Sequence, residues 1–201
     1  MITYIKGKLI EKKPTYIIIE CNGIGYFIHI SLHTYSLIPD KENLSIHTYY
    51  QVREDAHLLY GFYEEYERAV FKLLISVSGV GTNTARTMLS SLTPQQVVGA
   101  ISNKDNALIQ SAKGIGVKTA QRIILDLEDK VLKIASEEVE TGTPSTQKTS
   151  VNTHLASSEA LSALEVLGYP RKTTTKVVAS IVKKLPESSV EQIIKQALKK
   201  L

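Results

Sequence analysis

The sequence Gly-Val-Gly-Thr-Asn-Thr-Ala at residues 79–85 recurs as Gly-Ile-Gly-Val-Lys-Thr-Ala at residues 114–120, so the two copies start 35 residues apart. Both copies read Gly-aliphatic-Gly-x-x-Thr-Ala, and each lies between two apolar stretches of helical character. A Gly-x-Gly turn that opens a helix leaves backbone N–H groups without intrahelical partners, and these groups suit an anion. Two such turns side by side would hold two phosphates at a fixed spacing, as a duplex presents them across its minor groove.

Other glycine-rich motifs fit these residues less well. A dinucleotide-binding fingerprint needs a third glycine, a preceding strand and an acidic residue about 20 positions further on. Here Thr84 and Thr119 stand where a further glycine would be needed, and the preceding residues have a helical pattern. The chain also lacks a Walker-type Gly-Lys-Ser/Thr sequence, so we find no site for nucleotide hydrolysis. The remaining alternative is that both copies are helix–turn–helix packing units without a ligand.

The composition is that of an ordinary globular chain with a mildly basic balance. The 201 residues carry a formal net charge of +4, and the pI near 9.0 is only weak evidence for a nucleic-acid partner. Cys21 is the single cysteine, which excludes an intramolecular disulfide and a thiolate zinc site and fits a reducing compartment. The amino-terminal residues lack a signal-peptide core, and no apolar run reaches membrane-spanning length. We therefore expect a soluble, cytoplasmic protein with no membrane partner.

Residues 1–63 predict short strands. An apolar run before the turn at residues 12–15 is followed by the β-branched stretch from Tyr16 to Cys21. Asn22-Gly23 is a strong two-residue hairpin signal, after which the pattern resumes. Two more strands are expected at residues 44–52 and 57–62, around a tight corner. Five short strands in about 60 residues indicate a small barrel such as an OB-fold.

The pattern changes to helical periodicity over residues 64–133, which contain both glycine turns, and this predicts a duplicated helix–hairpin–helix unit. Thr93 and Pro94 fit the N-cap and first position of one of its helices. Residues 134–153 are polar and lose this periodicity, so we expect a flexible linker there. Residues 154–201 predict three short helices, a marginal size for a domain and one that suits binding to a partner.

The order of these segments resembles that of the RuvA family, which binds Holliday junctions within a bacterial branch-migration machine. The local matches are Val-Arg-Glu-Asp-Ala-His-Leu-Leu-Tyr-Gly-Phe-Tyr at residues 52–63, the two glycine hairpins, and Leu-Gly-Tyr at residues 167–169. The resemblance covers the whole chain. It implies an α+β multidomain fold with an OB-fold barrel, a tandem helix–hairpin–helix domain and a three-helix bundle of the ubiquitin-associated type.

The resemblance also implies DNA-binding residues, chiefly through phosphate contacts in the minor groove with little base readout. Lys118 and Arg122 on the second hairpin's helix are the best side-chain candidates, and Arg86 is the weaker counterpart on the first. The first hairpin has Asn83 where a basic residue is common, so it depends mostly on main chain. The complete set of DNA-binding candidates is Gly79, Gly81, Thr82, Asn83, Arg86, Gly114, Gly116, Val117, Lys118 and Arg122.

Glu54 and Asp55 correspond to an acidic pin that lies at the centre of a homotetramer in the family, sometimes paired as an octamer. Without the resemblance, these adjacent carboxylates would indicate only a turn. In the family reading they repel phosphates at the crossover and keep the junction open. The role of Arg53 beside them stays open between a phosphate and a neighbouring acid.

The third domain, by the same resemblance, docks a RuvB-type hexameric ATPase motor, and a RuvC-type junction resolvase is a further partner. The candidates for motor contact are exposed apolar residues near the 167–169 turn and on the last helix: Leu164, Leu167, Tyr169 and Leu198. The resemblance implies a non-catalytic subunit with no cofactor, metal or catalytic residue, acting in recombination, repair and the SOS response to DNA damage.

Two alternatives remain open from the sequence. A structure-selective nuclease or glycosylase also uses helix–hairpin–helix units, but a nuclease needs clustered carboxylates for metal ions. Outside Glu54 and Asp55 the acids are scattered or lie at residues 64–67 and 137–140. A protein adaptor with purely structural hairpins is the other alternative.

Overall fold

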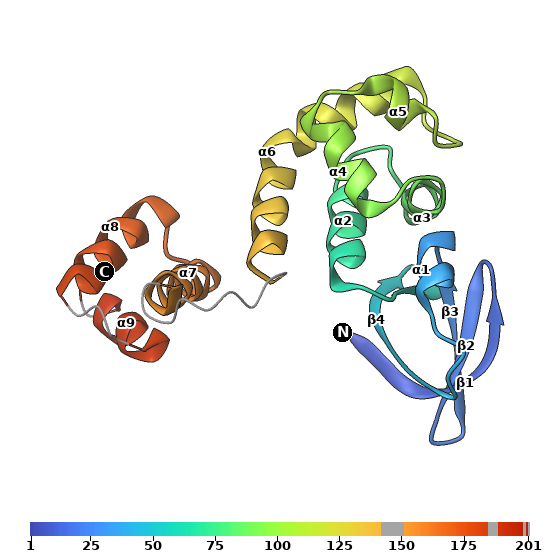
Figure 1. Ribbon diagram of the computed structural model, residues 1–201, viewed down its shortest axis with the longest axis horizontal. Helices are drawn as coiled ribbons and strands as arrows, with labels where there is room; N and C mark the ends of the chain where they lie inside the picture. Colours follow the sequence, from blue (N-terminus) through green and yellow to red (C-terminus); the bar gives the residue numbers. More distant parts are fainter. Residues whose placement is uncertain (142–150, 185–188, 199, 201) are drawn as a thin grey trace. The chain divides into compact units, whose positions relative to one another are not determined.

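The computed structural model describes residues 1–141, 151–184, 189–198 and 200 of the chain. The chain divides into two compact units, Met1–Thr143 and Pro144–Leu201. The first unit contains a β-barrel followed by helices, and the second is helical (Figure 1). In the described residues, no helix is long and apolar enough to cross a membrane.

The barrel is closed and has five strands in the order β1-β2-β3-β5-β4. Neighbouring strands are antiparallel except β3 and β5, which pair in parallel. The strands are β1 (Tyr4–Lys13), β2 (Tyr16–Cys21), β3 (Ile24–Ile30), β4 (Asn43–Val52) and β5 (His57–Phe62). The predicted five-stranded barrel is therefore confirmed.

Alternation along the strands explains why this barrel closes. Ile17 and Ile19 on β2, and Ile28 and Ile30 on β3, are buried in one apolar cluster, because every second side chain of a strand points to the same face. Between these strands, Asn22 and Gly23 have φ values of 50° and 82°, as a tight hairpin turn requires.

A short helix that the sequence pattern did not predict, α1 (Leu32–Leu37), follows β3. Its N-cap is Ser31, whose hydroxyl accepts a hydrogen bond from the Thr34 backbone N–H at 2.9 Å. The helix contacts α3, and so links the barrel to the helical half of the first unit.

The helical half consists of α2 (Glu65–Ile75), α3 (Thr82–Ser91), α4 (Pro94–Ser102), α5 (Asn106–Gln110) and α6 (Val117–Thr141). Thr93 is the N-cap of α4 and Pro94 lies in its first turn, as predicted, and Gln96 completes a capping box with Thr93. One prediction is wrong: α6 continues to Thr141, although a linker was expected from residue 134. Propensity explains the difference, because glutamate and alanine are good helix formers. The expected linker residues 142–150 lie outside the described residues.

Barrel and helices share an apolar core, which fixes one against the other. Tyr60 and Phe62 of β5 contact Phe71 of α2 with ring centroids 5.5 and 4.8 Å apart. All three residues are buried in the cluster that also contains the inward faces of α3, α4 and α6. The helix–hairpin–helix units therefore pack against one end of the barrel.

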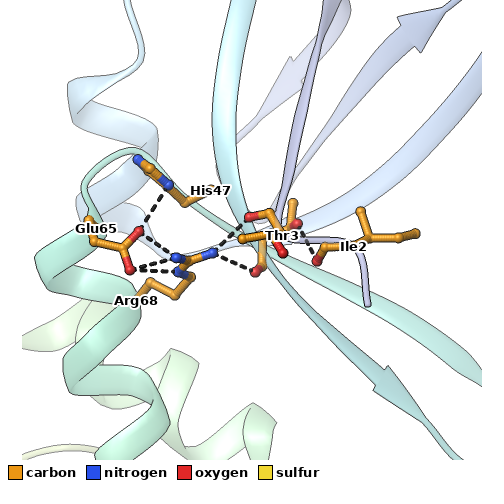
Figure 2. Close-up of polar contacts among 6 residues, drawn as sticks. Ile2, Thr3, His47, Glu65 and Arg68 are labelled. Carbon is orange, nitrogen blue, oxygen red and sulfur yellow. Dashed lines mark hydrogen bonds and ion pairs between the residues drawn. The ribbon is translucent and has the colours of Figure 1, made fainter. Parts of the chain in front are cut away.

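Arg68 of α2 adds a polar connection at the same boundary (Figure 2). Its Nη1 donates to the backbone carbonyl oxygens of Thr3 and Thr48 at 2.7 and 3.3 Å. Its other nitrogens bind the carboxylate of Glu65, which also pairs with His47 Nδ1 at 3.0 Å. Since Arg68 is only 6% exposed, these bonds satisfy a cation that would otherwise be buried without partners.

Glu67 of α2 makes a second polar connection, to α1. Its two carboxylate oxygens accept hydrogen bonds from the hydroxyls of Ser31 and Thr34. Thr34 Oγ1 also accepts from the Tyr63 backbone N–H at 3.2 Å. Burial raises the pKa of Glu67 to about 7, with a further increase from Glu64, while the two hydroxyl hydrogen bonds act in the opposite direction.

In the second unit, the described residues form α7 (Val151–Val166), α8 (Arg171–Lys184) and α9 (Val190–Ala197). Gly168 ends α7 with a φ of 93°, and the Tyr169 N–H bonds back to the Leu164 carbonyl at 3.0 Å, which is the expected glycine stop. The three predicted helices are present. Helix α7 starts at residue 151, inside the stretch 134–153 expected as linker. Pro186, expected to close the second helix, lies outside the described residues.

Candidate nucleic-acid interface

The two glycine turns have the same backbone conformation. Gly79 and Gly114 have φ values of 92° and 91°, in the left-handed region where a side chain would be strained. Gly81 is the N-cap of α3, with φ −83° and ψ 169°, and Gly116 precedes α6 in the same position. A Cβ added at any of these four glycines would meet no atom within 4 Å, so the outer surface of each turn is open.

Each turn is anchored by the aliphatic residue between its glycines. Val80 and Ile115 are 5% and 7% exposed and belong to the same apolar core. The flanking glycines are exposed in both copies. Both turns are therefore held against one core while their backbone faces solvent, which is the arrangement that a rigid ligand-binding turn requires.

Free backbone donors follow from the way each helix begins. The first intrahelical bonds are donated by Ala85 to the Gly81 carbonyl and by Ala120 to the Gly116 carbonyl, both at 2.9 Å. The N–H groups that precede Ala85 and Ala120 in the first turn have no intrahelical acceptor. They carry the partial positive charge of the helix N-terminus, and together they can donate to a phosphate.

The side chain of Thr82 does not face solvent, and this residue is a DNA-binding candidate through its backbone N–H. It is 3% exposed, and its Oγ1 lies 2.9 Å from the Tyr60 hydroxyl and 3.0 Å from the side-chain amide of Gln51. Thr82 can therefore contribute to a phosphate site only through its backbone, and its hydroxyl fastens the first turn to strands β4 and β5.

The second hairpin carries accessible cations. Lys118 and Arg122 are exposed, and four residues of spacing place them on one side of α6. Neither forms an ion pair or hydrogen bond with any other described residue. The structure adds Lys113, exposed just before Gly114, which the sequence reasoning missed. The signal was available, because Lys113 precedes the repeated motif directly.

The first hairpin is poorer in charge. Asn83 is exposed at the position equivalent to Lys118, and Thr87 is equivalent to Arg122. Arg86, the one cation of α3, donates from Nη1 to the backbone carbonyl of Thr15 at 3.1 Å. Arg86 therefore fastens α3 to the turn between β1 and β2, and its approach to His29 contributes, after burial, to a lowered pKa of that imidazole.

Glu54 and Asp55 lie in the short loop between β4 and β5, which the Arg53 N–H closes with a 2.8 Å bond to the Ala56 carbonyl. Both carboxylates are exposed, and within the described residues neither has an ion-pair partner. The loop thus presents two uncompensated negative charges at one end of the barrel, and these would repel a phosphate brought close to them.

Comparison with known proteins identifies the family. The family model described as "RuvA N terminal domain" matches residues 1–61, and "RuvA, C-terminal domain" matches residues 155–201. Between them, "SAM-like Helix-hairpin-helix tandem" matches residues 71–129. A protein of Christiangramia forsetii named Holliday junction branch migration complex subunit RuvA is 61% identical over 202 residues, covering 100% of both chains. This chain belongs to the RuvA family.

Further relatives with the same name support the assignment. The RuvA protein of Flavobacterium psychrophilum is 54% identical over 202 residues, and that of Bacteroides thetaiotaomicron is 46% identical over 205 residues. Each alignment covers 100% of both chains. The family resemblance stated from the sequence is confirmed, as is the combination of barrel, helix–hairpin–helix tandem and RuvA carboxy-terminal domain.

In the RuvA carboxy-terminal domain, the candidate contact residues separate into two groups. Leu164 is 0% exposed and lies in the core of the unit, so its prediction as an exposed contact is wrong, because it occupies the inward face of α7. Leu167 and Leu198 are 59% and 42% exposed. Tyr169 is half-buried against the same core.

No group of three or more potential metal ligands occurs among the described residues.

Proposed function

We propose that this chain binds four-way junction DNA by structure and not by sequence, through the phosphates of the minor groove. The observation that carries the proposal is the pair of hairpins with matching φ values and one shared core. Each hairpin offers main-chain donors at a helix N-terminus, which suit phosphates and carry no base specificity. Contacts of this kind allow a protein to slide along DNA.

Charge on the second hairpin supports the same function. Lys118 and Arg122 are exposed and unpaired among the described residues, so they can bind phosphates without first breaking an ion pair. Membership in the RuvA family indicates that the DNA is a four-way junction, because relatives carry the name of a Holliday junction branch migration subunit.

The acidic loop gives the preference for a branched substrate. In the proposed assembly, a homotetramer that can pair as an octamer, the carboxylates of Glu54 and Asp55 from each subunit form a ring at the crossover. Because they repel phosphates, they keep the junction open and direct the strands outward. We thus assign the recognition of junction shape to residues 1–63 and the binding of DNA phosphates to residues 64–133.

The carboxy-terminal helices are assigned to partners. We propose that residues 154–201 recruit a hexameric ATPase motor of the RuvB type, using exposed apolar groups such as Leu167 and Leu198 with the neighbouring Tyr169. The motor supplies ATP hydrolysis, and this chain supplies junction recognition. A RuvC-type resolvase is a further proposed partner, and the proposed location is the cytoplasm.

The test is an electrophoretic mobility shift at low salt that compares a four-way junction with linear duplex of the same arm sequence. We expect preferential binding of the junction, and Lys118→Ala with Arg122→Ala to weaken it without unfolding the chain. Each lost phosphate contact should lower the slope of log affinity against log salt by about 1. Lys130→Ala is the matched control, because Lys130 is exposed on the same helix further from the hairpin. Equal affinity for both substrates, or cleavage of the junction in magnesium, would reject the proposal.

A further inference from the structure

A chain of polar side chains joins the first hairpin to the acidic loop. It begins with the buried hydroxyl of Tyr60 on β5, which lies 2.9 Å from Thr82 Oγ1. The amide nitrogen of Gln51 on β4 donates to the same Thr82 oxygen at 3.0 Å. With this orientation, which satisfies both ends of the amide, the Gln51 oxygen accepts from Arg53 Nε and Nη2 at 3.3 and 3.2 Å.

The geometry leaves Arg53 exposed and its charge uncompensated. Among the described residues, no ion pair joins Arg53 to Glu54 or Asp55, although both are close in sequence. Its guanidinium is held by a neutral amide instead. Two of its five N–H donors are used by Gln51, so the remaining donors are available to a ligand.

The first hairpin lacks the cations that the second has. Asn83 and Thr87 occupy the positions of Lys118 and Arg122, and Arg86 is directed to the Thr15 carbonyl. The guanidinium of Arg53, however, lies only one amide group away from Thr82, the first residue of α3. The cation is thus linked through one side-chain amide to the residue whose backbone N–H is among the free donors of the first hairpin.

We propose that Arg53 is the phosphate-binding cation of the first hairpin, and that Gln51 is the residue that positions it. The proposal rests on the proposed function and assigns a residue to it. Arg53, the residue directly after β4, then supplies the cation that α3 lacks, so each hairpin binds a phosphate with main-chain donors and at least one cation. Because Thr82 is held by the same amide, the hairpin and the base of the acidic loop keep a fixed spacing.

The chain of contacts also explains why Arg53 does not neutralise the acidic loop. A guanidinium paired with Glu54 or Asp55 would lower the repulsion of phosphates at the crossover and would itself bind phosphate less well. Gln51 keeps the cation on the hairpin side. Attraction at the hairpin and repulsion at the loop therefore come from adjacent residues without cancelling.

The test is a double-mutant cycle on junction affinity with the full-length chain. Arg53→Ala, at an exposed position that tolerates truncation, should weaken binding about tenfold and lower the salt slope by about 1 for each bound subunit. Gln51→Leu should weaken binding about threefold in the wild-type background. In the Arg53→Ala background it should change affinity by less than twofold, because it acts through Arg53.

Two outcomes overturn the inference. An Arg53→Ala variant with unchanged affinity and salt slope, while Lys118→Ala with Arg122→Ala weakens binding, would leave the proposed function standing and remove Arg53 from it. An equal effect of Gln51→Leu in both backgrounds would make Gln51 a structural residue only. If the wild-type chain shows no preference for the junction, the proposed function itself fails, which the same gels report.

Discussion

Replacing Glu67 by glutamine should remove a pH dependence from the stability of the first unit. The carboxyl is fully buried between α1 and α2, where Ser31 and Thr34 donate to its two oxygens. Burial raises its pKa to about 7 from the ordinary 4.5. Glu67→Gln preserves the shape of the protonated acid, and its amide can bond to the same two hydroxyls, so the fold should be retained.

The sign of the effect follows from the raised pKa. Between pH 4.5 and 7 the folded chain holds a proton that the unfolded chain releases. The free energy of unfolding that this proton contributes is complete below pH 4.5 and is lost as the pH rises through 7. From pH 5 to pH 8 the loss is roughly 2–3 kcal/mol. The glutamine variant has no such titration, so it should gain stability relative to wild type by about this amount over the same range.

The assay is urea denaturation at several pH values, followed by near-ultraviolet circular dichroism of tyrosine. Tyr169 is the only one of the 10 tyrosines outside residues 4–66, so the signal reports the first unit. The pH dependence that other groups contribute is common to both proteins and cancels in the difference. A difference between variant and wild type that stays constant from pH 5 to pH 8 would refute the reasoning.

Three further predictions address the rest of the first unit and the second. Arg68→Met should lower the free energy of unfolding by about 2 kcal/mol, since it removes the buried hydrogen bonds to two barrel carbonyls. A loss of less than ~0.5 kcal/mol, measured by urea denaturation, would contradict this. Glu54→Gln with Asp55→Asn should keep or raise DNA affinity and relax the preference for the junction in a competition assay with duplex; a loss of affinity would count against the pin. Deletion of residues 150–201 should preserve junction binding and abolish stimulation of the motor's ATPase, and a loss of DNA binding would show that the assignment of roles is wrong.

Much of the fold was predictable because local signals agreed with tertiary packing. Three local signals each predicted one structure that packing then retained. These are the alternating isoleucines of β2 and β3, the Asn22-Gly23 hairpin turn and the helix start at Thr93-Pro94. Helix α1 was missed because its six residues are too few for a periodic signal. The length of α6 was missed because the loss of apolar periodicity was given more weight than the high helix propensity of glutamate and alanine.

The candidate site was predictable in its backbone and less so in its side chains. The repeated glycines led directly to two turns with the same φ. The sequence could not reveal that Arg86 bonds to Thr15 or that Thr82 is buried against Tyr60, because both contacts join residues far apart in the chain. The cation that we propose for the first hairpin therefore comes from outside α3, from Arg53 directly after β4.

The most direct measurement of the central claim, that main-chain amides at the hairpins bind phosphate, is the junction affinity of Val117→Pro. Proline removes the N–H of the first helical residue but is tolerated there, as Pro94 shows at the start of α4. Val117→Ala is the control, since it truncates the exposed side chain and keeps the N–H. We expect the proline variant to stay folded and lose about tenfold or more in affinity, as for one charge-assisted hydrogen bond, while the alanine variant binds normally. Equal binding by the two folded variants would contradict the account.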